Sequence, residues 1–169
     1  VLSGGKSRRM GRPKASLQIA GSPMIAFTER ALAPLCDRVY HLGPKGLPDL
    51  APHSGPLAGI LAARHHHPEA WWVIAACDMP LITQAAVEWL LTHRCDGAHV
   101  VMPRNDAGVV QPTFALYGPG SEVLLSTLKA PREAQDHPGV LHPEIPESLA
   151  MAWTNINTPE ALNALSAGR

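Results

Sequence analysis

The residues best suited to chemistry lie at the start of the chain, where glycines and cations follow one another closely. The adjacent Gly4 and Gly5 precede Lys6, Arg8, Arg9 and Lys14. Glycine lets a backbone approach a ligand because no Cβ intervenes, and successive backbone N–H groups form a concavity that favours anions. Lysine and arginine add charge and donors that suit phosphate. The segment therefore predicts a phosphate-binding loop at the end of a strand.

Two other interpretations of this loop stay open. It can be a solvated basic surface loop, or a Walker-type loop, since Gly5-Lys6-Ser7 matches the end of that motif. A Walker loop leads directly into a helix, whereas Gly11 and Pro13 follow here and both discourage one. A phosphate cradle of another nucleotide fold is therefore favoured, with the surface loop second and the Walker loop third.

Asp78 directly follows the clearest buried strand, the apolar run 71–77. A carboxylate at a strand end can bind Mg²⁺, which takes one or two protein carboxylates together with phosphate oxygens of a substrate. Asn155 and Asn157 alternate with Ile156, so their side chains are expected to face one direction and to offer polar groups to metal-bound water or phosphate. Capping or turn formation by Asp78 and Asn157 is the structural alternative.

Two further motifs are less specific. Gly55 and Pro56 form a turn that enters a helix, and its backbone can face a base or ribose without hindrance. A helix start with a closely packed glycine explains the same residues. The run His65-His66-His67 does not predict a zinc site, because consecutive residues of a helix point in different directions.

The elements that must position these residues alternate between strands and helices. Expected strands cover residues 1–2, 15–19, 38–42, 71–77, 98–102, 112–117 and 150–155. Expected helices cover residues 24–32, 57–64, 84–93 and 121–128, and a last one opens at 158–160. This alternation predicts an α/β fold with three layers and a mostly parallel central sheet, whose ligand lies beyond the carboxyl ends of the strands. The segment 131–147 is expected to be a mobile loop near the acceptor or a plain surface connection.

Composition limits the class of protein. A chain of 169 residues, 46% of them hydrophobic, suits one domain with a substantial core. Fourteen basic and fourteen acidic residues give zero net charge, which argues against a general role on nucleic acid or on a membrane surface. Cys36, Cys77 and Cys95 form no C-x-x-C pair and fit a reducing cytoplasm.

Taken in order, these segments resemble the molybdenum cofactor guanylyltransferases, which are nucleotidyltransferases with a Rossmann-like fold. The matching segments are 2–11 with Lys14, 55–60, 77–80, 111–112 and 155–160. The resemblance implies that the terminal phosphate of molybdopterin attacks the α-phosphate of GTP. Pyrophosphate then leaves, and a guanine dinucleotide cofactor forms. It also implies Mg²⁺ as cofactor, and cofactor-synthesis proteins or client molybdoenzymes as further partners.

The resemblance also implies roles for individual residues. The nucleotide would contact Leu2, Ser3, Gly4, Gly5, Lys14, Asp49, Gly55, Pro56, Leu57, Asp78, Asn155 and Asn157. The catalytic group would be Lys14, Arg8, Arg9 and Asp78. In it, Lys14 binds triphosphate and offsets developing charge, the two arginines assist around the leaving pyrophosphate, and Asp78 holds Mg²⁺. The asparagines would support the metal and the acceptor phosphate. Asp49 departs from the family pattern, because its spacing to Gly55 is shortened.

Alternative functions remain. A molybdenum cofactor cytidylyltransferase or another small nucleotidyltransferase shares much of the pattern. That sister group tends to open with two alanines before its glycine and lacks the run 55–59, so this chain favours guanine. A nucleotide-binding regulator without catalysis is a second alternative, and the retained Lys14 and Asp78 argue against it.

Overall fold

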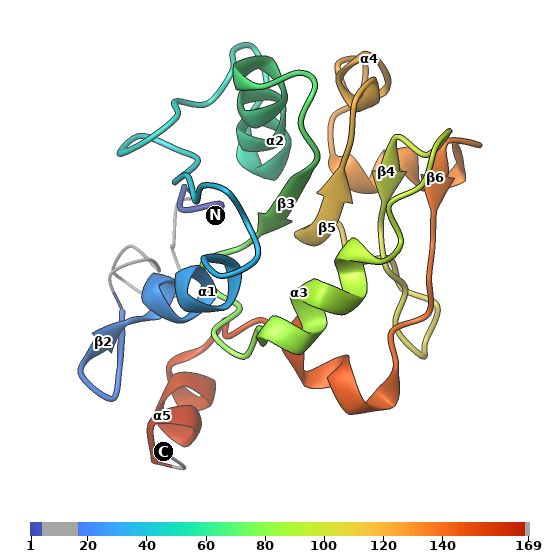
Figure 1. Cartoon of the computed structure of the whole chain (residues 1–169). Coiled ribbons are helices and arrows are strands. Elements are labelled where there is room, and N and C mark those ends of the chain that lie inside the picture. Colours follow the sequence, from blue (N-terminus) through green and yellow to red (C-terminus); the bar gives the residue numbers. More distant parts are fainter. Residues whose placement is uncertain (5–16, 168–169) are drawn as a thin grey trace.

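The computed structural model describes residues 1–4 and 17–167. Figure 1 shows a central sheet with helices on both sides, and the C-terminal helix packed near a small hairpin. The strands are β1 (Gln18–Ile19), β2 (Ser22–Pro23), β3 (Trp72–Ala75), β4 (Val100–Val101), β5 (Phe114–Tyr117) and β6 (Val140–Leu141). The helices are α1 (Met24–Leu32), α2 (Gly55–His66), α3 (Gln84–Leu91), α4 (Ser121–Leu125) and α5 (Pro159–Ala167), with 3₁₀ helices η2 (Pro131–Asp136) and η3 (Glu147–Trp153). None of the helices in the described part of the chain is long and apolar enough to cross a membrane.

The central sheet is mixed, which corrects the expectation of a mostly parallel one. Its strand order is β3-β5-β4-β6, with β5 antiparallel to both neighbours and β4 parallel to β6. Beyond β3, Leu2 forms parallel bridges with both Ala76 and Leu42. β5 runs antiparallel because a hairpin joins it to β4, in which Arg104 faces Val110. A parallel neighbour would need a crossover of a dozen or more residues.

Side chains alternate along the strands and divide the core between the two faces of the sheet. Phe114 and Leu116 pack with α1, α3 and η3. Ala115 and Tyr117 pack on the other side with α2 and with residues around α4 and η2. The sheet therefore lies between two layers of helices, and we refer to its second side as the α2 face.

Several expected elements are different in the structure. In the expected strands 1–2 and 38–42, only Leu2 and Leu42 pair, as isolated bridges. The segment 150–155 is not a strand, because residues 147–153 form η3. Trp153 of η3 is buried, packs on Phe114 and donates its indole N–H to the Phe114 carbonyl at 3.0 Å. The segment 131–147 is more than a connection, since it contains η2 and then β6, which pairs with β4.

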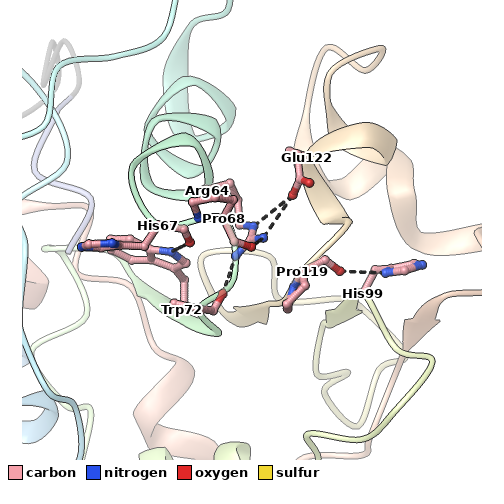
Figure 2. Close-up of polar contacts among 8 residues, drawn as sticks. Arg64, His67, Pro68, Trp72, His99, Pro119 and Glu122 are labelled. Carbon is pink, nitrogen blue, oxygen red and sulfur yellow. Dashed lines mark hydrogen bonds and ion pairs between the residues drawn. The ribbon is translucent and has the colours of Figure 1, made fainter.

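A buried arginine joins α2 to α4. The side chain of Arg64 is fully buried, and its Nη atoms donate to the carbonyls of Pro68 and Ala70. Its Nε and Nη2 each lie 3.2 Å from Oε2 of Glu122. Figure 2 shows the guanidinium between these partners. These contacts fix the C-terminal end of α2, and the N-terminal end of the same helix lines the pocket described next.

Candidate functional site

A pocket of about 900 Å³ lies at the carboxyl ends of β3 and of the segments around Leu2 and Leu42. It is lined by Leu2, Ser3, Gly4, Leu42, Pro44, Asp49, Ser54, Gly55, Pro56, Ala76, Cys77, Asp78, Thr113 and Asn155. Eight of the residues that the sequence singles out are therefore together: Leu2, Ser3, Gly4, Asp49, Gly55, Pro56, Asp78 and Asn155. The pocket lies beyond the carboxyl ends of parallel strands, which is where ligands bind in α/β sheets.

Backbone hydrogen bonds hold the segment 2–4 at one wall of the pocket. Leu2 donates to Ala75 O at 2.8 Å and accepts from Cys77 N at 3.0 Å. On the other side, Ser3 N donates to Leu42 O at 3.0 Å. Leu2 is thus an extended residue between two parallel neighbours, and the chain leaves the sheet at Gly4, beside the pocket.

Asp78 is positioned by the turn that follows β3. Its carbonyl accepts from Ile156 N at 2.7 Å, which brings Asn155 to the same wall. The buried Thr28 hydroxyl lies 3.4 Å from Met79 O and supports this turn from α1. The Asp78 side chain is half-buried, so its carboxylate combines access to the pocket with a fixed backbone.

The start of α2 and Asp49 form the opposite wall. Gly55 has φ +65°, a conformation that glycine adopts without strain, and Pro56 fills the first turn, where its missing N–H costs nothing. The carboxylate of Asp49 lies close to where Cβ atoms would stand on Gly4 and Gly59, at 4.0 and 3.8 Å. Side chains at either glycine would therefore narrow the space beside Asp49.

The charged side chains that line the described part of this pocket are all acidic. Among the lining residues that the structure describes, Asp49 and Asp78 are the charged ones, and neither lysine nor arginine is present. Carboxylate and amide oxygens are the donors that Mg²⁺ prefers, so Asp78 with Asn155 suits that cation. An anionic ligand would need further positive charge, and the sequence offers it in the segment 5–16.

Some predicted residues do not lie at the pocket. Leu57 is almost fully buried in the core of the α2 face, so it supports the helix and does not line the wall. Asn157 is exposed and does not share the pocket with Asn155. The expected helix cap belongs instead to Thr158, whose hydroxyl accepts from Ala161 N at 3.2 Å. Gly5, Arg8, Arg9 and Lys14 lie outside the described residues.

Thr113 is a pocket residue that sequence reasoning missed. Its carbonyl accepts from Ala76 N at 2.9 Å, which places it beside the end of β3. The preceding Pro112 carbonyl accepts from the buried Tyr117 hydroxyl at 2.8 Å. Burial raises the pKa of Tyr117, so the phenol stays protonated and keeps donating. The adjacent Gln111-Pro112 motif was the available signal.

A substitution at Gly43 tests the close packing at this wall. Gly43 has φ +134°, and a Cβ there would stand 3.0 Å from Gly4 N. We expect Gly43→Ala to lower the free energy of unfolding by about 2 kcal/mol, from backbone strain and crowding together. Urea unfolding measures this loss. Gly97→Ala is the matched control, since Gly97 has φ +86° with nothing within 4 Å. Equal losses in both variants would contradict the crowding of Gly4.

Comparison with known proteins shows the family to which this chain belongs. The profile of the family described as "MobA-like NTP transferase domain" matches residues 1–148. A probable molybdenum cofactor guanylyltransferase of Bacillus licheniformis is 34% identical over 129 residues, which cover 69% of this chain and 66% of that protein. A probable molybdenum cofactor guanylyltransferase of Flavobacterium johnsoniae is 27% identical over 183 residues, covering 98% and 94%. The chain thus spans just under two thirds of the Bacillus relative and nearly all of the other.

The fold has a counterpart among solved structures. Molybdopterin-guanine dinucleotide biosynthesis protein A from Archaeoglobus fulgidus matches with a TM-score of 0.82 at 21% identity, over 98% of this chain and 95% of that one. This match shows a shared nucleotidyltransferase fold.

Proposed function

The chain belongs to the MobA-like NTP transferase family, and we propose that within it the chain transfers GMP from GTP to the terminal phosphate of molybdopterin. The observation that carries the proposal is the pocket at the carboxyl edge of the sheet. There the segment 2–4, the start of α2, Asp78 and Asn155 face one space. The names of the Bacillus and Flavobacterium relatives support guanine and the pterin acceptor.

In this proposal the nucleoside of GTP lies against the segment 2–4, Asp49 and the α2 start. Gly4 and Gly55 leave room there for a flat base and its ribose. The triphosphate extends toward Asp78 at the end of β3. Mg²⁺, held by Asp78 with help from Asn155, would neutralise phosphate charge when bound. Lys14, Arg8 and Arg9 of the opening segment are proposed to supply the remaining positive charge.

The reaction needs positioning more than covalent chemistry. An oxygen of the acceptor phosphate forms a bond to the α-phosphorus, and the bond from that phosphorus to the bridging oxygen of pyrophosphate breaks. The nucleophile is already an anion, so no side chain has to remove a proton. The protein contributes a fixed pocket and preorganised charge. We propose that the chain forms a single nucleotidyltransferase domain, acts in the cytoplasm and works on small molecules.

Nucleotide selectivity is the first test of this function. We expect Mg²⁺-dependent binding of GTP to be at least about tenfold tighter than that of CTP or ATP. Tenfold corresponds to about 1.4 kcal/mol, which is the size of one hydrogen bond made to guanine and lost with the other bases. Isothermal titration of the full chain with each nucleotide measures it. Selective CTP binding would move the chain to the cytidylyl branch, and no preference would remove the support for a transferase specific for guanine.

Product formation is the second part of the same test. With GTP, Mg²⁺ and molybdopterin, pyrophosphate should appear together with the guanine dinucleotide cofactor. Pyrophosphate release that does not depend on molybdopterin would contradict the acceptor. Binding of GTP without any turnover would instead support a nucleotide-binding regulator.

A further inference from the structure

Arg104 carries a charge that neither the fold nor the transfer reaction described above uses. Its Nε is buried and has no hydrogen-bond partner. Within residues 1–4 and 17–167, the ion pairs are His41 with Glu29 and Arg64 with Glu122, and none includes Arg104. Arg104 as a whole is half-buried, but buried donors such as its Nε are nearly always paired. Arg64 differs, because the fold satisfies its donors, so the Arg104 guanidinium is the one left available to an anionic ligand.

The backbone holds Arg104 firmly. Its N–H donates to Pro143 O at 3.0 Å, and its carbonyl accepts from Ile145 N at 2.9 Å. It also forms an antiparallel bridge with Val110, across the hairpin that joins β4 to β5, and a parallel bridge with Glu144. The exposed Glu144 makes no ion pair with Arg104 in the described part of the chain. Arg104 is therefore fixed between two neighbouring segments and presents its side chain from a rigid base, which favours binding of a ligand at a defined place.

Arg104 lies at the same edge of the sheet as the pocket. β3 ends near Asp78, and β5, which is antiparallel to it, begins after Thr113. β4 runs antiparallel to β5, so its continuation through Arg104 leaves the sheet at that edge. Hydrogen bonds from Ala76 N to Thr113 O and from Gln111 N to Pro103 O connect these chain ends, at 2.9 and 2.8 Å. Two strand spacings, roughly 10 Å, thus separate the backbones near Asp78 and Arg104.

Arg104 also belongs to the pocket's side of the sheet. Val100 and Met102 pack in the core of the α2 face, together with residues of α2 itself. Arg104 follows Met102 by two residues in extended backbone, so the alternation of strand side chains gives it the same face. The start of α2, which lines the pocket, lies on this face too.

We propose that Arg104 binds the phosphate of the acceptor, on the side of Asp78 away from the nucleotide. This inference rests on the proposed function. In-line attack requires the acceptor to approach the α-phosphate from the side opposite the leaving group. With GTP between the segment 2–4 and α2, the open approach is over the ends of β5 and β4. There Arg104 offers a guanidinium whose forked donors match phosphate.

The test compares Arg104→Gln, Arg104→Lys and a matched control in the full chain. Arg94→Gln is the control, because Arg94 is exposed and lines a separate cavity of about 730 Å³ beside the start of β3. We expect Arg104→Gln to raise the KM for molybdopterin about tenfold or more, because the substitution removes one charged hydrogen bond. The Kd for GTP should stay unchanged. The KM of Arg104→Lys for molybdopterin should lie between those of the wild type and Arg104→Gln, and the KM of the control should equal that of the wild type.

Melting temperature separates this role from a structural one. Without ligand, Arg104→Gln should melt at or above the wild-type temperature, because it removes a buried Nε donor that has no partner in the fold. A clear fall, or an unchanged KM for molybdopterin in a folded variant, would overturn the proposal. A raised Kd for GTP with an unchanged KM for molybdopterin would place Arg104 at the nucleotide, and it would likewise overturn the proposal.

A probe that does not depend on turnover keeps the two proposals distinguishable. With GTP and Mg²⁺ saturating, inorganic phosphate should further raise the melting temperature of the wild type and of Arg94→Gln, but not of Arg104→Gln. If the wild type transfers no GMP, the proposed function fails, while this phosphate shift still shows the anion site at Arg104. Equal shifts in all three proteins, or no shift in any, would overturn the site.

Discussion

Replacing Asp78 by asparagine should lower the rate of GMP transfer about 10²-fold or more and raise the Mg²⁺ concentration needed for half-maximal activity. The carboxylate lines the pocket at the end of β3, and its backbone is tied to Ile156. Asparagine keeps the shape but loses the charge that a hard cation prefers, and removal of one preorganised electrostatic group typically costs 10²–10³ in rate. Initial rates across a Mg²⁺ titration measure both effects.

Asp49→Asn provides the comparison for this prediction. Asp49 lies in the same pocket, beside Gly4 and Gly59 at the wall formed with α2. Its loss should weaken GTP binding but leave the Mg²⁺ titration of the remaining activity unchanged. If Asp78→Asn kept a normal metal titration, or if both variants shifted it equally, Asp78 would not be the metal ligand. Circular dichroism should show both variants folded, since each exchange preserves side-chain volume.

Local sequence signals predicted the helices better than the strand directions, and several of the residues that they singled out line one pocket. The helix 24–32 was predicted with its observed bounds, because Pro23 marks its start. Thr83 caps α3, accepting from Ala86 N at 3.2 Å, and a threonine directly before a helix is a local signal of such a cap. The pocket could be anticipated because chain ends of neighbouring strands meet at one edge. The inferences about the helices depend on residues within a few positions of one another, whereas the one about the pocket depends on the edge at which the strands end.

What the sequence could not predict depends on distant pairing. Nothing local in 112–117 distinguishes a parallel strand from the antiparallel β5, and the direction follows from the hairpin around Gly108, which has φ +73°. The short β6 exists through its pairing with β4. Apolar residues at 150–153 suggest a strand, but packing of Trp153 on Phe114 selects a 3₁₀ helix. A motif also does not reveal which way a helix turns. Leu57 was predicted to contact the nucleotide, and the structure shows that its side chain is buried in the core.

Replacing Arg64 by methionine should lower the free energy of unfolding by about 3 kcal/mol. Methionine fills much of the same volume, but the part-buried hydrogen bonds to the carbonyls of Pro68 and Ala70 are lost. Hydrogen bonds of a charged group contribute about 1.5–3 kcal/mol each. Glu122 is 39% exposed, so water replaces part of its lost interaction. Urea unfolding followed by tryptophan fluorescence measures the change.

Glu122→Gln isolates the ion pair from the rest of this arrangement. Because that carboxylate is partly exposed, its exchange should cost no more than about 1 kcal/mol. If both variants lost the same stability, the ion pair rather than the two carbonyls would hold Arg64 in place. Arg64 and Gly55 lie near opposite ends of α2, so Arg64→Met should also weaken GTP binding where Glu122→Gln does not. The pocket depends on a helix start whose position is set by the buried contacts at the other end of that helix.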